Sequence, residues 1–362
     1  MELFERCLSP IINRTLGKSS VSTRYCCNEE LRPEGRKRLD TCNRIENIII
    51  NLGQENVSRR WLKSNNHMRQ FVLLLIITVA ACLQPAWAGA KRALLIGVSS
   101  YQAHSHAQLD WNNIHGANDV ALVAATLKRQ GFAVDMLTNR HATARAIRRA
   151  LARLASQTRA GDLVYIHFSG HGQPYEDTNN DESDGWDEAI VPYDAGRRYI
   201  KGVYEGRNHI VDDEMNRYIT KVRKRAGRRG FVYFVLDACH IGGYSRGQDQ
   251  RGDSIVMRGA DTGFSPSGKP YVPLIDKRPL VRMTRGRNMA GACYVEACRA
   301  YQVNYELRVG NTYYGALSYY VNQVLKRHRL TPDCSWVNQV GKAMSADRRL
   351  VNQNMVVERS VR

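Results

Sequence analysis

The sequence predicts an α/β fold with a mostly parallel sheet, and three features of the chain indicate it. Residues 162–168 and 230–236 are near-continuous apolar runs, as expected for strands that are covered on both faces. Helical patterns alternate with such runs, and this alternation favours parallel strands joined by right-handed crossovers. With 362 residues, 43% of them hydrophobic, the chain is long enough to bury a core of this kind.

The first half of the fold is expected to alternate strand and helix. A strand over residues 92–98 precedes a helix whose apolar positions begin at Val120 and which ends at Gly131, since glycine commonly terminates helices. Residues 132–137 form the next expected strand, and residues 143–155 form an Arg-rich amphipathic helix. The inward face of that helix carries Ile147, Leu151 and Leu154.

The end of the chain is predicted to contain a strand, two helices and a short final strand. The strand begins at Gly291, and the helices cover residues 313–324 and 335–344. Residues 244–290, which are rich in Gly, Arg, Asp and Pro, are interpreted as a long loop or linker ahead of this part.

The first 88 residues are interpreted as two segments ahead of the folded body. Residues 1–67 are polar and irregular, and we expect a disordered leader or sequence upstream of the true start. Residues 68–88 combine a basic start, a short apolar stretch and a small-residue cleavage pattern at Ala86-Trp87-Ala88, as in export signals. The body is therefore expected to be exported, to the periplasm or outside the cell. The stretch Val79-Ala80-Ala81-Cys82 resembles a lipoprotein box, so a lipid anchor at Cys82 is the alternative.

Composition argues against two other classes of protein. The net charge of +19 would suit a polyanion-binding protein, but the arginines are dispersed and no nucleic-acid module is recognisable. A solubilising surface charge is therefore the favoured interpretation. The nine cysteines have no zinc-site spacing, although a Cys293–Cys334 or a Cys298–Cys334 disulfide would suit an oxidising compartment.

Two of the apolar strands end in residues that are suited to nucleophilic catalysis. His171 lies in Ser169-Gly170-His171-Gly172, and Cys239 lies in Asp237-Ala238-Cys239-His240. Open α/β sheets place their chemistry at the carboxyl ends of such strands. A cysteine attacks a carbonyl as the thiolate, so it needs a base such as His171 beside it. The pattern predicts a His171–Cys239 dyad, while Cys298, which lacks a histidine motif of its own, is interpreted as structural.

Four motifs, in their order along the chain, resemble those of the metacaspases, which are caspase-fold cysteine peptidases that cut after arginine or lysine. They are Ile96-Gly97, Asn118-Asp119, the Ser-Gly-His-Gly motif at 169–172 and the Asp-Ala-Cys-His motif at 237–240. The resemblance implies a three-layer α/β/α sandwich around a mostly parallel six-stranded sheet. It divides one domain into a catalytic region (89–243), a linker (244–290) and a small-subunit-like region (291–362).

The resemblance also implies roles for individual residues. The amides of Gly172 and Cys239 would stabilise the oxyanion. Asp119, Ser169 and Asp237 would line the pocket for a basic side chain. Such a pocket needs carboxylates, because an unpaired guanidinium is costly to bury. The alternative interpretation of Asp119 is that it caps the N-terminus of a helix.

An acidic stretch over residues 176–188 suggests calcium binding, with a solvated turn as the alternative. By resemblance, Asp187, Asp212 and Asp213 are the expected calcium ligands. Arg246 stands where the family has a fourth acidic ligand. We therefore expect no required cofactor, with calcium as an activator left open.

The expected activity is endopeptidase cleavage of proteins or peptides after Arg or Lys, with self-processing in the linker at Arg246, Arg251 or Arg258. An uncut linker is the alternative to self-processing. A catalytically weak scaffold in the cell envelope is the alternative function, because Ile241 and Arg246 depart from the family pattern. We expect a monomer with no nucleic-acid partner, and membrane contact only through the signal or a lipid anchor.

Overall fold

The computed structural model describes residues 89–361 apart from residues 181, 183, 240–255, 261, 274, 276–279, 285 and 351. All of these lie in one compact unit, which runs from Ala86 to Arg362. The predicted leader, the export signal with Cys82, Ile241 of the catalytic region, and the linker residues Arg246 and Arg251 lie outside the described residues. Within the described part, no helix combines the length and the apolar character that crossing a bilayer requires.

A seven-stranded sheet in the order β2-β1-β3-β7-β9-β12-β8 forms the centre of the unit. The first five of these strands are mutually parallel, whereas β12 runs antiparallel to β9 and parallel to β8. The first six strands make up the predicted mostly parallel sheet. The seventh, β8, is an edge strand that comes from the predicted linker. The bounds are β1 Lys91–Gly97, β2 Ala133–Thr138, β3 Leu163–Ser169, β7 Phe231–Asp237, β8 Leu280–Thr284, β9 Gly291–Glu296 and β12 Val356–Val361.

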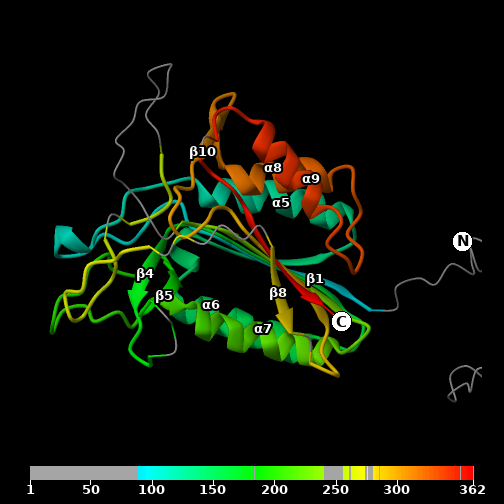
Figure 1. The fold of residues 1–362 in the computed structure, drawn as a ribbon, viewed down its shortest axis with the longest axis horizontal. Helices are drawn as coiled ribbons and strands as arrows, with labels where there is room; N and C mark the ends of the chain where they lie inside the picture. Colours follow the sequence, from blue (N-terminus) through cyan, green and yellow to red (C-terminus); the bar gives the residue numbers. More distant parts are fainter. Residues whose placement is uncertain are drawn as a thin grey trace, which may run out of the picture. The chain divides into compact units, whose positions relative to one another are not determined.

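Helices cover both faces of this sheet and complete the predicted three-layer sandwich, as Figure 1 shows. Helices α5, α8 and α9 lie on one face, and α6 and α7 lie side by side on the other. The inward residues predicted for α6 are buried in the core, as their spacing requires. The bounds are α5 Gly116–Arg129, α6 Ala144–Gln157, α7 Asp212–Ala226, α8 Ala316–Leu325 and α9 Val337–Ala346.

Close packing of α5 against the ends of β1 and β3 sets the position of the site. A Cβ on Gly97 would lie 2.5 Å from the Gly116 carbonyl oxygen and 2.5 Å from a methyl group of Val120. A Cβ on Gly116 would lie 2.3 Å from the Ser169 carbonyl oxygen. Only glycine fits at these two positions, and their contact brings the first turn of α5, with Asp119, to the end of β3.

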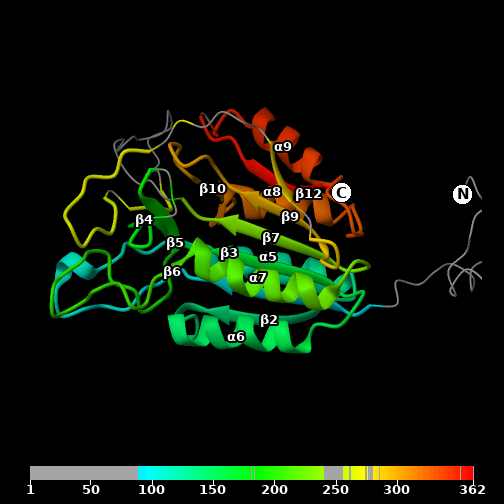
Figure 2. The same ribbon diagram turned by 60° about the horizontal axis from the view of Figure 1, so that its bottom comes forward.

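Short strands lie beyond the carboxyl ends of the parallel strands, in the direction in which β7 points in Figure 2. The helix predicted over residues 313–324 begins only at Ala316, because Thr312–Gly315 pairs with Glu306–Val309 as a hairpin. The predicted short strand in the tail is β12. The remaining bounds are β4 Gly172–Glu176, β5 Trp186–Ile190, β6 Ile210–Val211, β10 Glu306–Val309, β11 Thr312–Gly315, and the 3-10 helices Ala107–Leu109 and Asn139–His141.

Candidate active site

The backbone at Cys239 and at Gly172, the residue after His171, meets at a single carbonyl group. Ser169 of β3 lies opposite Asp237 of β7, and His171 and Cys239 each follow two residues later. The backbone amides of Cys239 and Gly172 both donate to the carbonyl oxygen of Arg258, with N···O distances of 2.8 and 3.5 Å. The adjacent strand ends therefore bring the predicted base, nucleophile and oxyanion donors to one place.

The imidazole of His171 is held in one orientation. Its Nε2 donates to the carbonyl oxygen of Asn112 at 2.9 Å, and its ring stacks on Trp111 with 4.8 Å between centroids. Its Nδ1 is buried and has no hydrogen-bond partner among the described residues. Burial lowers the pKa of His171 to about 4, and the hydrogen bond to Asn112 opposes this only in part. The ring is therefore neutral, with the Nδ1 lone pair available to accept a proton.

The thiol of Cys239 is fully buried and lies against a second cysteine. Its Sγ donates to the carbonyl oxygen of Gln302 at 3.0 Å, and Sγ of Cys298 contacts the same oxygen at 3.5 Å. The four described cysteines are all thiols, so neither disulfide suggested by the sequence is present. Cys334 contacts Cys293, and their hydrogen bond is the main reason that the pKa of Cys293 is raised.

The pocket predicted for a basic side chain is filled by Arg258 of the linker. Its side chain is fully buried, with Nη2 at 2.8 Å from Asp119 and Nη1 at 3.4 Å from Asp237. Nη1 also donates to the hydroxyl of Ser169 at 2.6 Å. All three predicted pocket residues therefore contact one guanidinium. Glu306, to which the sequence assigned no role, accepts from Nη2 at 2.7 Å and from Nε at 3.1 Å.

The pKa values of the pocket groups are set by burial and by the charges of their neighbours. Burial would lower the pKa of Arg258, but the charges of Asp119, Asp237 and Glu306 raise it. Burial likewise opposes ionisation of Asp237, but the Arg258 charge and hydrogen bonds from its neighbours hold its pKa below the usual value. Burial, helped by the charge of Asp237, raises the pKa of Asp119 to about 7 despite Arg258. Asp119 is therefore the pocket carboxylate that takes up a proton near neutral pH.

Backbone groups from the small-subunit-like region hold the carboxylates in place. Asp237 accepts from the amide of Ser318 and from Nδ2 of Asn304, both at 2.7 Å. Asp119 accepts from the amide of Gly315 at 3.0 Å. A Cβ on Gly315 would lie 2.3 Å from Asp237 Oδ2, so only glycine leaves room here. The N-cap reading of Asp119 is wrong, because the N-cap of α5 is His115.

The backbone around Arg258 pairs like an added strand. The amide of Arg258 donates to the carbonyl of Asn304 at 3.2 Å, and the amide of Glu306 donates to the carbonyl of Val256 at 3.1 Å. Met257 and Tyr305 form an antiparallel bridge between these bonds. We call Val256–Gly259 the docked segment. Strand addition of this kind is a common mode of peptide recognition.

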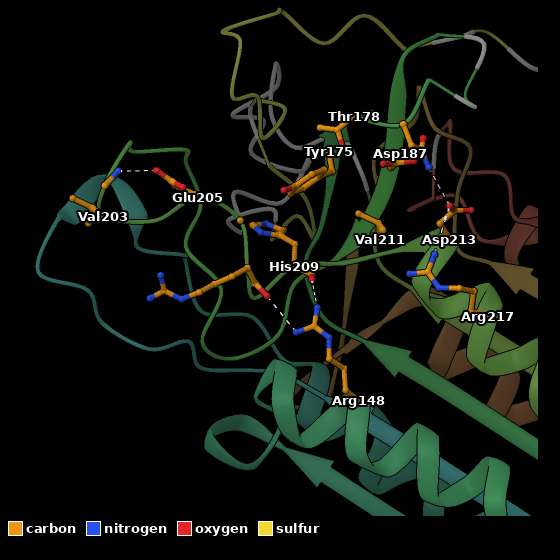
Figure 3. A pocket seen from close by; sticks show the side chains of 14 residues that line it. Arg148, Tyr175, Thr178, Asp187, Val203, Glu205, His209, Val211, Asp213 and Arg217 are labelled. Atoms are coloured by element: carbon orange, nitrogen blue, oxygen red, sulfur yellow. Dashed lines mark hydrogen bonds and ion pairs between the residues drawn. The ribbon is translucent and has the colours of Figure 1, made fainter.

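Two of the three residues expected to bind calcium line one cavity, and the third does not. Asp187 and Asp213 line a polar cavity of about 660 Å³, but Asp212 does not (Figure 3). Arg217, another lining residue, lies 3.9 Å from Asp213. Within the described ranges, no group of three or more His, Cys, Asp or Glu side chains is placed to hold a metal ion. Calcium binding at these positions therefore stays a prediction, and the fourth position, Arg246, lies outside the described residues.

The sheet order, with a histidine and a cysteine at neighbouring strand ends, is that of a caspase-like fold. A family model described as the caspase domain matches residues 90–358, and the chain belongs to this family. The resemblance to the metacaspases that the motifs indicate is therefore confirmed, and so is the predicted α/β fold class.

Many curated proteins and solved structures are similar to the chain. Metacaspase-3 of Arabidopsis thaliana is 35% identical over 169 residues, which is 44% of this chain and 41% of that protein. Metacaspase-1A of Neurospora crassa is 31% identical, covering 42% of this chain and 32% of its own. The chain thus matches about a third to two fifths of the length of these relatives. The crystal structure of protein GSU0716 from Geobacter sulfurreducens is 19% identical, with a TM-score of 0.51 over 75% of this chain and 94% of that one, which supports the fold alone.

Proposed function

We propose that this protein is a cysteine endopeptidase that hydrolyses peptide bonds after arginine or lysine, with Cys239 as nucleophile and His171 as base and acid. One observation carries the proposal. Arg258 has its guanidinium among three buried carboxylates while its carbonyl oxygen accepts from the amides of Cys239 and Gly172. A peptide bound for cleavage after arginine needs this pairing of acidic pocket and oxyanion donors.

The reaction follows from the positions of these groups. The Cys239 thiol turns from the Gln302 carbonyl and gives its proton to Nδ1 of His171, and the thiolate attacks the carbonyl carbon. The two amides stabilise the oxyanion that forms. His171 then returns the proton to the leaving amine, and Asn112 holds its ring through Nε2. Water, deprotonated by the same imidazole, hydrolyses the thioester.

Self-processing is the second part of the proposal. Of the three linker arginines expected as cleavage sites, Arg258 lies in the described part of the chain, and its position supports the Arg258–Gly259 bond as the one that is cut. While Arg258 occupies the pocket, it also excludes any other substrate. Release of the docked segment, by cleavage or by movement, is therefore required before a second peptide can bind.

Purified full-length protein tests self-processing. The wild type should yield two fragments, the second beginning at Gly259, and Cys239→Ala should stay whole. Arg258→Gln should abolish this cut and Arg258→Lys should retain it. Arg287→Gln, which removes an exposed arginine of the same region, is the matched control. Cleavage at the same bond in Cys239→Ala would refute the proposal.

Peptides with Arg, Lys or Asp before the scissile bond test activity on other substrates. We expect hydrolysis of the first two only, by a protein acting as a monomer. Covalent labelling of Cys239 by a thiol-directed arginyl peptide would support the enzyme, whereas no labelling and no hydrolysis would favour the scaffold alternative. Running the assay with and without calcium tests whether calcium activates the enzyme. The proposed export is tested separately, by mapping the amino terminus of the native protein.

A further inference from the structure

Cys298, which the sequence suggests is structural, lies next to the proposed nucleophile Cys239. The Sγ atoms of Cys239 and Cys298 share one acceptor, the carbonyl oxygen of Gln302, at 3.0 and 3.5 Å. Both side chains are buried, with relative exposures of 0% and 7%. Two thiols that contact the same oxygen atom are neighbours in space.

The backbone brings the two cysteines to adjacent strand ends. Leu236 of β7 lies opposite Glu296 of β9, and the amide of Ala297 donates to the Leu236 carbonyl at 3.0 Å. Cys239 and Cys298 follow this pair by three and two residues. Neighbouring strands are about 4.8 Å apart. Cα atoms joined by a disulfide are typically about 4.4–6.8 Å apart. The strand ends therefore suit a disulfide between these residues.

The electrostatics keep Cys298 protonated while Cys239 is reduced. The pKa of Cys298 is raised well above its usual value, first by its hydrogen bond with Cys239, then by burial and by the charges of Cys239 and Glu296. Cys298 therefore does not compete as a nucleophile in the resting site. Oxidation of Cys239 removes the first of these causes and the Cys239 charge, so fewer groups then oppose ionisation of Cys298.

We propose that Cys298 is a resolving thiol, which forms a reversible disulfide with Cys239 when the nucleophile is oxidised by a peroxide. The Cys239 thiolate attacks a peroxide oxygen, the O–O bond breaks, and Cys239 becomes a sulfenic acid while hydroxide leaves. The Cys298 sulfur then attacks Sγ of Cys239, the S–O bond breaks, and the hydroxyl leaves as water with the Cys298 proton. The peroxide gains two electrons and the two thiols lose them.

This disulfide would protect the nucleophile from irreversible oxidation and would switch the site off. The consequence for activity rests on the proposed function, because only a catalytic Cys239 is silenced in this way. Formation of the bond itself does not depend on peptidase activity.

The test treats full-length wild type and Cys298→Ser with hydrogen peroxide, followed by alkylation and peptide mapping. In the wild type we expect a cross-linked peptide joining Cys239 and Cys298, a mass loss of two hydrogen atoms, and full reversal by dithiothreitol. In Cys298→Ser, Cys239 should gain two oxygen atoms that dithiothreitol does not remove. Cys334→Ser is the matched control and should behave as the wild type does.

The result that overturns the inference is oxygen gained at Cys239 in the wild type, at the rate seen in Cys298→Ser, without the cross-link. If Cys298→Ser fails to fold, the cross-linked peptide of the wild type decides alone. A cross-link in a protein that cleaves no peptide would refute the proposed function while supporting this inference. Peptidase activity with no cross-link would support the proposed function and refute this inference.

Discussion

Replacing Glu306 by glutamine should reduce the activity on arginine peptides selectively. Oε1 of Glu306 accepts from Nη2 and Nε of the bound guanidinium, at 2.7 and 3.1 Å. Its Oε2 lies 2.5 Å from Nδ1 of His115. Glutamine can keep its carbonyl toward the guanidinium and place its amide group as a donor to Nδ1 of His115, in the tautomer that carries its proton on Nε2. The substitution therefore removes a charge without leaving a buried group unpaired.

The magnitude follows from the contacts that change. A hydrogen bond to a charged group contributes about 1.5–3 kcal/mol, and about 1.4 kcal/mol corresponds to a factor of ten. Breaking a buried ion pair outright costs about 3–5 kcal/mol. The smaller figure applies here because Asp119 and Asp237 still face the guanidinium. We expect kcat/KM for arginine peptides to fall by about 10- to 150-fold.

The assay compares three peptides that differ only before the scissile bond: arginine, lysine and citrulline. The loss should be largest for arginine, smaller for lysine, which has no Nε donor in this position, and absent for neutral citrulline. Glu205→Gln, which removes an exposed carboxylate, is the matched control and should change none of them. An equal loss on all three peptides would show that Glu306 acts on folding or on the reaction rather than on recognition of the cation.

Three further predictions concern protonation and positioning. The preference for arginine over citrulline should rise with pH above about 7, by at most about tenfold per unit, because the pKa of Asp119 is raised to about 7 even beside Arg258, and an ionised Asp119 attracts the cation; a flat ratio across that range would contradict this. His171→Asn should lower kcat by about 10²–10⁴ with little change in KM, measured on arginine peptides after thiol titration; an unchanged kcat would exclude His171 as the base. Gln353→Leu should lower kcat/KM more for arginine than for citrulline, because Gln353 donates to the Asn304 side chain, which in turn donates to the pocket carboxylate Asp237, and accepts from the backbone amide of Tyr305; an equal loss would show that Gln353 acts only through the backbone.

The architecture and the meeting of the two motifs could be predicted from the sequence because both depend on local patterns. Apolar runs predict central strands, and parallel strands place their carboxyl ends at one edge of the sheet. The register of β3 and β7 pairs Ser169 with Asp237, and beyond this pair the amides of Gly172 and Cys239 reach one carbonyl oxygen.

The occupant of the pocket could not be predicted, because it depends on the path of the linker. Composition identifies basic residues in that stretch, but it does not say which of them turns back into the sheet. Glu306 was missed for the same reason: one acid at the start of a short hairpin strand carries no signal until tertiary contacts bring it within 2.7 Å of a guanidinium. The hairpin also explains the misplaced start of α8, since aromatic residues such as Tyr313 and Tyr314 suit a strand as well as a helix.

The segment Gln302–Glu306 contacts both the occupant of the pocket and the nucleophile. The Glu306 side chain contacts the guanidinium, the Asn304 carbonyl accepts from the amide of the residue to be cleaved, and the Gln302 carbonyl accepts from the Cys239 thiol. With Arg258 in the pocket, the Cys239 thiol still donates to the Gln302 carbonyl, so seating a cation does not by itself release the thiol. The proposed attack therefore needs a separate rotation of the thiol toward His171. The basic side chain contributes by positioning the carbonyl group, which gives a physical reason for a peptide without one to react slowly even when it reaches the site.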